Sequence, residues 1–297
     1  MERDGIAMLL LSGTLPTSDV PITVGRVKLD GRKMSIGDRE VPPEMLSIGA
    51  TAMMAAALKT TEALGAEPPM SVVAGDLGEG AGSKLVYQYL TEEAGGLGPS
   101  IVTLHYILPL RNEFLGFVEM ADYWAKRPFL VADAGALLIA KATRVCDKFD
   151  LFTPDAGEIS FLADPDAGHP AYVKAALFEV DTIEVPRLIA QAYAAKNTPR
   201  YLLVKGPTDF IVEDGKIIHT VSEPNIPAME PIGGTGDTLT GIVSALISAG
   251  FDPVKAGLIA SKANRLAGAL SNPTPATRVF EIVDHIGEAV RKTVDEQ

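Results

Sequence analysis

Short apolar runs alternate with segments of helical periodicity along most of this chain, and this alternation limits the folds that it can adopt. The apolar runs predict strands at residues 71–74, 100–108, 129–132, 150–153 and 201–205. Apolar residues at helical spacing predict helices at 44–64, 84–91, 113–126, 136–146, 186–197, 237–249, 253–270 and 276–292. Short strands joined by amphipathic helices form a mainly parallel sheet with both faces covered. The sequence therefore predicts an α/β fold with three layers, α/β/α.

The first 41 residues follow a different pattern. Residues 22–29 and 33–36 indicate two short strands around a turn at Asp30 and Gly31. We therefore expect residues 1–41 to form a β flap or hairpin. No repeat, low-complexity tract or long linker divides the sequence, so we expect residues 1–297 to form a single domain.

Composition excludes several classes of protein. The chain has 26 Lys and Arg against 38 Asp and Glu, a net charge of −12, which disfavours broad contact with nucleic acid or anionic membrane. The apolar run at 7–11 is too short for a signal peptide core or a membrane span. The single cysteine, Cys146, excludes an internal disulfide, and we interpret it as a packed thiol in a helix. We expect a cytoplasmic homo-oligomer that acts on a small molecule.

A glycine-rich run precedes one of the predicted helices. Residues 232–241 read IGGTGDTLTG and lead into the apolar stretch IVSALISAG. Glycines let successive backbone N–H groups converge on an anion, and the positive end of the following helix adds to the attraction. Asp237 falls in the first helical turn, where a carboxylate can cap the helix and face a ligand. The run therefore predicts an anion site with a carboxylate beside it.

This run resembles the signature of ribokinase-like proteins, and most closely that of the NAD(P)H-hydrate dehydratases, the YjeF C-terminal or carbohydrate kinase-related branch. Three other segments agree in order and content. VKGPTD at 204–209 resembles the Lys-Gly strand end of the family, FTPDAGE at 152–158 its Thr-Pro-His-Pro-Gly-Glu motif, and LVADAGAL at 130–137 its Asp-Ala-Asp-Ala-Leu strand end. The resemblance implies a ribokinase-like fold, and it makes Asp237 the catalytic base.

The resemblance also implies a set of binding residues. Those expected to hold the nucleotide are Lys205, Gly206, Pro207, Thr208, Asp209, Gly233, Gly234, Thr235 and Gly236. Those expected to contact the substrate are Gly78, Asp133, Asp155 and Asp237. Asp155 and Glu158 lie three residues apart beside a strand end and offer the hard oxygen ligands that Mg²⁺ prefers. The expected cofactors are ATP or ADP with Mg²⁺.

Some positions depart from the family pattern. Asp155 stands where the dehydratases usually have a histidine, and AGDLG at 74–78 matches the family's Gly-Pro-Gly-Leu-Gly only at Leu77 and Gly78. Two enzymatic functions therefore stay open. One is an ATP- or ADP-dependent NAD(P)H-hydrate dehydratase, and the other is an ATP-dependent kinase of a sugar or another small hydroxylated metabolite. A nucleotide sensor without turnover would have no chemical need for Asp237.

Two weaker features have structural interpretations. The glycine-rich segment at 75–84 follows a strand and opens a helix, yet it matches neither the P-loop nor the full dinucleotide-binding spacing. It is either a loop that faces the substrate or a plain turn. The four histidines, at positions 105, 169, 219 and 285, lack the close spacing of metal ligands, and we interpret each as structural or solvated.

Overall fold

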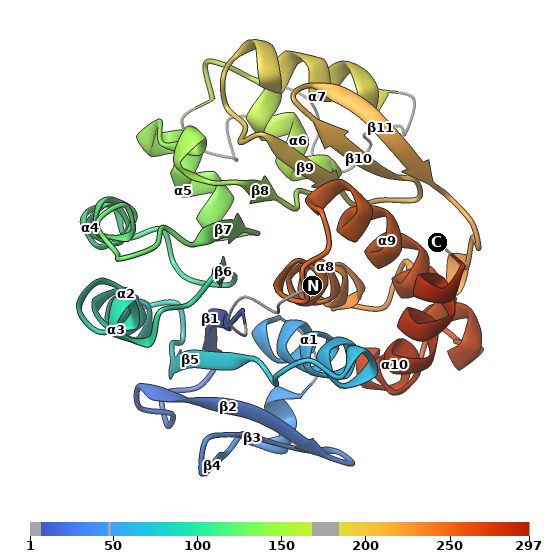
Figure 1. The fold of residues 1–297 in the computed structure, drawn as a ribbon, viewed down its shortest axis with the longest axis horizontal. Helices are drawn as coiled ribbons and strands as arrows, with labels where there is room; N and C mark the ends of the chain where they lie inside the picture. The colour runs from blue at the N-terminus through green and yellow to red at the C-terminus, as the bar shows by residue number, and fades with distance from the viewer. Residues whose placement is uncertain (1–6, 47–48, 168–183, 297) are drawn as a thin grey trace.

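The computed structural model describes residues 7–46, 49–167 and 184–296, and one sheet passes through all three stretches (Figure 1). Its strands lie in the order β11-β10-β9-β8-β7-β6-β1-β5-β2-β3-β4. Their bounds are β1 (Leu9–Leu15), β2 (Thr23–Asp30), β3 (Lys33–Ile36), β4 (Arg39–Glu40), β5 (Met70–Gly75), β6 (Ile101–Leu104), β7 (Phe129–Ala132), β8 (Leu151–Phe152), β9 (Tyr201–Val204), β10 (Asp209–Glu213) and β11 (Lys216–Val221).

The middle of the sheet is parallel and its edges are antiparallel. Strands β9, β8, β7, β6, β1 and β5 run in one direction. Antiparallel strands extend both edges, with β10 and β11 beyond β9 and with β2, β3 and β4 beyond β5. The carboxyl ends of the parallel strands therefore open at one edge of the sheet, where α/β proteins of this kind bind ligands.

Helices cover both faces of the sheet (Figure 1). One face carries α1 (Ala50–Leu64), α8 (Thr235–Ser248), α9 (Pro253–Ser271) and α10 (Val279–Asp295). The other carries α2 (Ala81–Glu92), α3 (Ala94–Leu97), α4 (Arg111–Ala121), α5 (Gly135–Thr143), α6 (Ala156–Ala163) and α7 (Val185–Ala194). Successive strand side chains point to opposite faces, so Leu9 and Leu11 of β1 enter one core and Leu10 the other.

Small residues bring α1 and α8 into close contact. Gly241 of α8 lies against the backbone of α1, and a Cβ atom there would be 2.2 Å from the carbonyl oxygen of Met53. The alanines of α1 have no side-chain atoms beyond Cβ, so the two helix backbones can approach each other closely. As a result, the amino ends of both helices meet at the open edge of the sheet.

The three-layer α/β/α fold and the mainly parallel sheet expected from the sequence are confirmed. Strands β2 and β3 pair as the predicted hairpin. The same N-terminal region also supplies β1, to which the sequence analysis assigned no strand, and β1 lies between β5 and β6 within the parallel part. Cys146 lies after α5 in a short 3-10 turn (Cys146–Lys148) rather than in the helix, and burial raises the pKa of its thiol to about 12. No helix in the described residues is long and apolar enough to cross a membrane.

Candidate functional site

Polar side chains directly follow three of the parallel strands. His105 follows β6, Asp133 follows β7 and Lys205 follows β9. Because parallel strands end at the same edge of the sheet, these three side chains meet there. His105 and Asp133 are each only 1% exposed.

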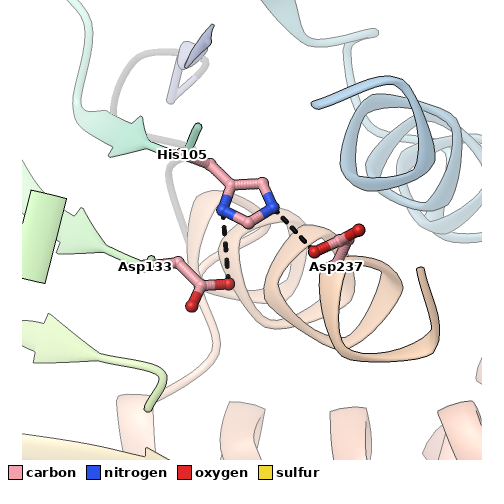
Figure 2. Close-up of side chains that lie close together, drawn as sticks. All are labelled: His105, Asp133 and Asp237. Atoms are coloured by element: carbon pink, nitrogen blue, oxygen red, sulfur yellow. Dashed lines mark hydrogen bonds and ion pairs between the residues drawn. The ribbon is translucent and has the colours of Figure 1, made fainter. Parts of the chain in front are cut away.

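Asp237 reaches the same place from α8, in the helix layer that covers one face of the sheet. The preceding glycine run turns sharply at Gly234, where φ is 100°, and α8 begins at the next residue. In the first turn of α8, the Asp237 carboxylate accepts one hydrogen bond from the Gly49 backbone N–H, at 2.6 Å, and lies 2.9 Å from Nε2 of His105 (Figure 2). It is thus held between two helix amino ends and one imidazole.

These contacts keep Asp237 ionised. Burial by itself raises the pKa of a carboxyl group, and Asp237 is only 8% exposed. The hydrogen bond and charge of His105, followed by Lys205 and the Gly49 N–H, outweigh burial and hold the pKa of Asp237 below its ordinary value. A buried carboxylate that stays charged at neutral pH can accept a proton from a ligand.

Asp133 and Lys205 form a second charged pair beside it. The Lys205 ammonium lies 2.8 and 2.9 Å from the two carboxylate oxygens, and Thr240 of α8 donates its hydroxyl to one of them. Burial favours the neutral amine, but Asp133 and then Glu158 raise the pKa of Lys205 above its ordinary value. The ammonium lies about 3.7 Å from where a Cβ of Gly236 would be, so it faces the glycine run.

His105, Asp133 and Asp237 are residue types that bind metals, and their ligand atoms lie within 4.8 Å of one another. The two carboxylates nevertheless approach different nitrogens of the ring, from opposite sides (Figure 2). Each carboxylate thus occupies the side of a ring nitrogen from which a metal ion would bind. We interpret these three residues, with Lys205, as a charge network that holds Asp237.

A cavity of about 610 Å³ opens in front of this network. The predicted site residues that line it are Asp133, Asp155, Glu158, Lys205, Gly206, Pro207, Asp209, Thr235, Gly236 and Asp237. Four predicted residues do not line it: Gly78, Thr208, Gly233 and Gly234. The structure thus gathers the Asp237, Lys205 and Asp155 motifs around one space and leaves Gly78 outside it.

Gly78 belongs to the glycine-rich loop between β5 and α2, whose backbone N–H groups bond to the carboxylate of Asp76 in the same loop. One oxygen of Asp76 accepts hydrogen bonds from the backbone N–H groups of Gly78, Glu79 and Gly80. The other oxygen accepts from the N–H and hydroxyl groups of Ser83. The backbone N–H groups of this loop do converge on an anion, and that anion is the carboxylate of Asp76. Of the two interpretations, these contacts favour the plain turn, and Gly78 does not line the cavity in front of Asp237.

The segment after β9 is held by a residue that the sequence analysis did not single out. Arg265 of α9 bonds to the carboxylate of Asp209 and to the carbonyl oxygens of Gly206 and Pro207. Asp209 in turn accepts the N–H of Gly206. The Asp209 side chain is thereby committed to shaping the loop, and Lys205 is the member of this motif whose charge faces the cavity.

Asp155 and Glu158 cap α6 and also line the cavity. Each uses one carboxylate oxygen to accept the backbone N–H of the other. Burial, followed by the charge of Asp133, raises the pKa of Glu158 to about 8. A cation would relieve this crowding of carboxylates, and the remaining oxygens are the ligands that Mg²⁺ prefers. The residues present therefore fit a magnesium ion.

The interpretation of His105 as merely structural or solvated missed its place in the site. The available signal was position rather than spacing, because His105 follows an apolar run just as Asp133 and Lys205 do. His169 lies outside the described residues. Arg265, Asn264 and the cavity wall at residues 224–230 carried no comparable signal, since tertiary packing alone brings them here.

Known proteins are similar to this chain in sequence and in fold. Residues 113–286, more than half of the chain, match the family model described as NAD(P)H-hydrate dehydratase. An uncharacterized protein of Methanocaldococcus jannaschii is 42% identical over 82% of this chain and 100% of its own length. The ADP-dependent (S)-NAD(P)H-hydrate dehydratase of Cenarchaeum symbiosum is 31% identical over 46% of this chain and 42% of its own, so the match spans less than half of that relative.

Solved structures agree on the fold. Bacillus subtilis YxkO superimposes with a TM-score of 0.57 at 18% identity, over 97% of this chain and 92% of that one. Ribokinase from Thermotoga maritima gives a TM-score of 0.52 at 15% identity, over 97% and 99%. The fold is ribokinase-like, as the glycine run and strand-end motifs led us to expect. With the family match covering the strand-end motifs and the Asp237 run, this chain belongs to the NAD(P)H-hydrate dehydratase family of lyases.

Proposed function

We propose that this protein repairs hydrated NADH and NADPH in a nucleotide-dependent dehydration. The reaction would phosphorylate the hydroxyl of the hydrate and then eliminate phosphate to restore the reduced nicotinamide ring. One observation carries the proposal: a buried, ionised Asp237 faces a cavity beside the glycine run and the Lys205 ammonium. This arrangement suits the removal of a hydroxyl proton next to a phosphoryl group.

In the first step, Asp237 accepts the proton of the substrate hydroxyl. The hydroxyl oxygen attacks the terminal phosphorus of the nucleotide, and the bond from that phosphorus to the leaving phosphate oxygen breaks. Gly49 and His105 fix the carboxylate for this transfer. The backbone N–H groups before α8 and the Lys205 ammonium balance the charge on the phosphate oxygens.

In the second step, the C–O bond of the phosphorylated hydrate breaks and phosphate leaves with the electron pair. The adjacent carbon gives its proton to the departing phosphate, and its C–H electrons form the double bond that restores conjugation. Asp155 and Glu158, which line the same cavity, would hold Mg²⁺. When bound, Mg²⁺ supplies positive charge that offsets the charge of the nucleotide phosphates.

Either ATP or ADP could serve as donor, and relatives named ADP-dependent dehydratases favour ADP. The cytoplasmic location and homo-oligomeric state stay predictions.

The test is a repair assay with purified protein, hydrated NADH, Mg²⁺ and either ATP or ADP. We expect the absorbance of reduced nicotinamide to return with one nucleotide, and Asp237→Asn to abolish this while still binding the nucleotide. Binding is measured by thermal shift, which also shows that the variant folds. No recovery with either nucleotide, together with consumption of ATP when a sugar or another small alcohol is added, would identify a small-molecule kinase instead.

A further inference from the structure

The residue after His105 has an unusual backbone conformation. Tyr106 has a φ of 54°, in the left-handed region that bulky side chains rarely adopt. Its carbonyl oxygen accepts both the backbone N–H of Thr14, at 3.1 Å, and the Thr14 hydroxyl, at 2.5 Å. The end of β1 therefore holds this conformation in place. Glycine would adopt it without strain, so the presence of tyrosine calls for an explanation that involves its side chain.

The Tyr106 ring is supported from the protein side. It packs edge-on against the His105 ring, with centroids 4.4 Å apart. It also lies over Gly49, where an added Cβ would be 3.4 Å from the ring. Despite these supports the side chain is 46% exposed, and it lines the cavity. A rigidly held aromatic surface is therefore presented to whatever enters.

The phenol group lies among the charges of the reaction site. Burial, followed by the charges of Asp237 and Asp133, raises the pKa of Tyr106 to about 12. The side chain thus lies within electrostatic reach of the carboxylate that we propose as base. Of the described residues that line the cavity, Tyr106 is the one with a six-membered aromatic ring. A partly unsaturated six-membered ring next to the reacting hydroxyl is the ligand class that such a surface suits.

We propose that Tyr106 is a specificity-determining residue whose ring packs against the nicotinamide ring of the substrate. This inference rests on the proposed function and assigns the side of the cavity at which the reacting ring binds. The nucleotide phosphates bind elsewhere, near Lys205 and Gly236. Loss of the Tyr106 ring should therefore weaken binding of the nicotinamide compound and leave nucleotide binding unchanged.

The experiment compares Tyr106→Phe, Tyr106→Leu and Tyr106→Gly with the unchanged protein. The probe is NADH, the product of the proposed reaction, whose binding is followed by its own fluorescence and needs no turnover. We expect the Kd for NADH to stay within about twofold in the Phe variant and to rise roughly tenfold in the Leu and Gly variants. The Gly variant should melt no lower than the unchanged protein, because it relieves the left-handed strain.

Either of two kinds of result would overturn the inference. One is unchanged NADH affinity in the Leu and Gly variants, or no NADH binding by the unchanged protein. The other is an equal loss of affinity for NADH and for the nucleotide, which would indicate a general disturbance of the cavity. Failure of the proposed function would look different, because the unchanged protein would then bind NADH in a Tyr106-dependent way without converting its hydrate.

Discussion

Two glycine-rich segments of this molecule each lead into a helix and contain an aspartate, but the two aspartates make different contacts. In the loop before α2, Asp76 turns back and accepts the backbone N–H groups around it. In the loop before α8, Asp237 reaches instead to Gly49 and His105, and none of its hydrogen bonds within the described residues comes from its own loop. The Asp237 carboxylate therefore does not take up the N–H groups of the second loop, as the proposed anion site requires. A plain glycine-rich turn differs from an anion site in whether a carboxylate of the protein already bonds to its backbone N–H groups. Glycine content does not tell the two apart.

The largest expected contrast comes from the same substitution in each loop. Asp237→Asn should reduce turnover by a factor on the order of 10² to 10⁴, because the amide cannot accept the hydroxyl proton. Its stability should fall less than that of the Asp76 variant, because within the described residues Asp237 makes two hydrogen bonds and Asp76 accepts five. Asp76→Asn should keep turnover close to normal but lower the free energy of unfolding by about 2–3 kcal/mol, because an amide group replaces one well-bonded oxygen. Repair assays and urea unfolding of both variants measure this contrast, and a reversed pattern would refute it.

His105 offers the next largest effect. His105→Leu removes the donor to Asp237 and should lower kcat roughly 10- to 100-fold, with the KM for nucleotide unchanged. His105→Gln keeps one N–H donor and should recover part of the loss. Without His105, burial acts on Asp237 with less opposition, so its pKa rises and the acid limb of the kcat/KM profile moves to higher pH. An acid limb that does not move in either variant would reduce His105 to a packing role.

Glu158 should make cation binding depend on pH. With a pKa of about 8, the carboxyl group is largely protonated at pH 7, and Mg²⁺ must displace that proton. We therefore expect the Mg²⁺ concentration for half-maximal activity to fall as pH rises from about 7 to 9. Glu158→Gln should remove this dependence and weaken activation. A requirement for Mg²⁺ that is flat with pH in the unchanged protein would contradict the assignment.

The smallest effect concerns the stability of the Asp76 loop. Backbone and hydroxyl donors outweigh burial and lower the pKa of Asp76 in the folded state. A group with a lowered folded pKa stabilises the protein above its unfolded pKa, and this contribution is lost as pH falls through the folded value. The melting temperature of the unchanged protein should therefore decline more steeply below about pH 4 than that of Asp76→Asn. Parallel declines would show that the loop contributes nothing to acid sensitivity.

Local sequence patterns were enough to predict the three layers of the fold and many of the residues that line the cavity. Apolar runs and helical periodicity locate most of the elements, and the strand-end motifs with Asp237 locate the cavity because parallel strands share one open edge. Strand β1 (Leu9–Leu15) was missed because the apolar run at 7–11 was weighed only as a signal peptide or membrane span, and its place between β5 and β6 depends on pairing with strands distant in sequence. The resemblance implied that Gly78 contacts the substrate, and this stays a prediction, because a match at Leu77 and Gly78 does not show whether Asp76 occupies the N–H groups of the loop.

His105 and Arg265 show the same limit in the site. His105 and Asp237 are 132 residues apart in the sequence. They become hydrogen-bond partners only because the end of β6 meets the start of α8 in the fold. Arg265 acts on a loop that precedes it by 56 residues or more. Position after an apolar run could have placed His105 at the open edge of the sheet, but nothing in the sequence pairs it with Asp237 or pairs Arg265 with its loop.

A crystal structure with ADP, Mg²⁺ and a hydroxylated nicotinamide analogue would test the account most directly. We predict terminal phosphate oxygens between the N–H groups at the start of α8 and the Lys205 ammonium, with the analogue's hydroxyl within hydrogen-bond reach of Asp237. Phosphate bound instead at the loop before α2, or an Asp237 carboxylate that faces no ligand, would contradict it.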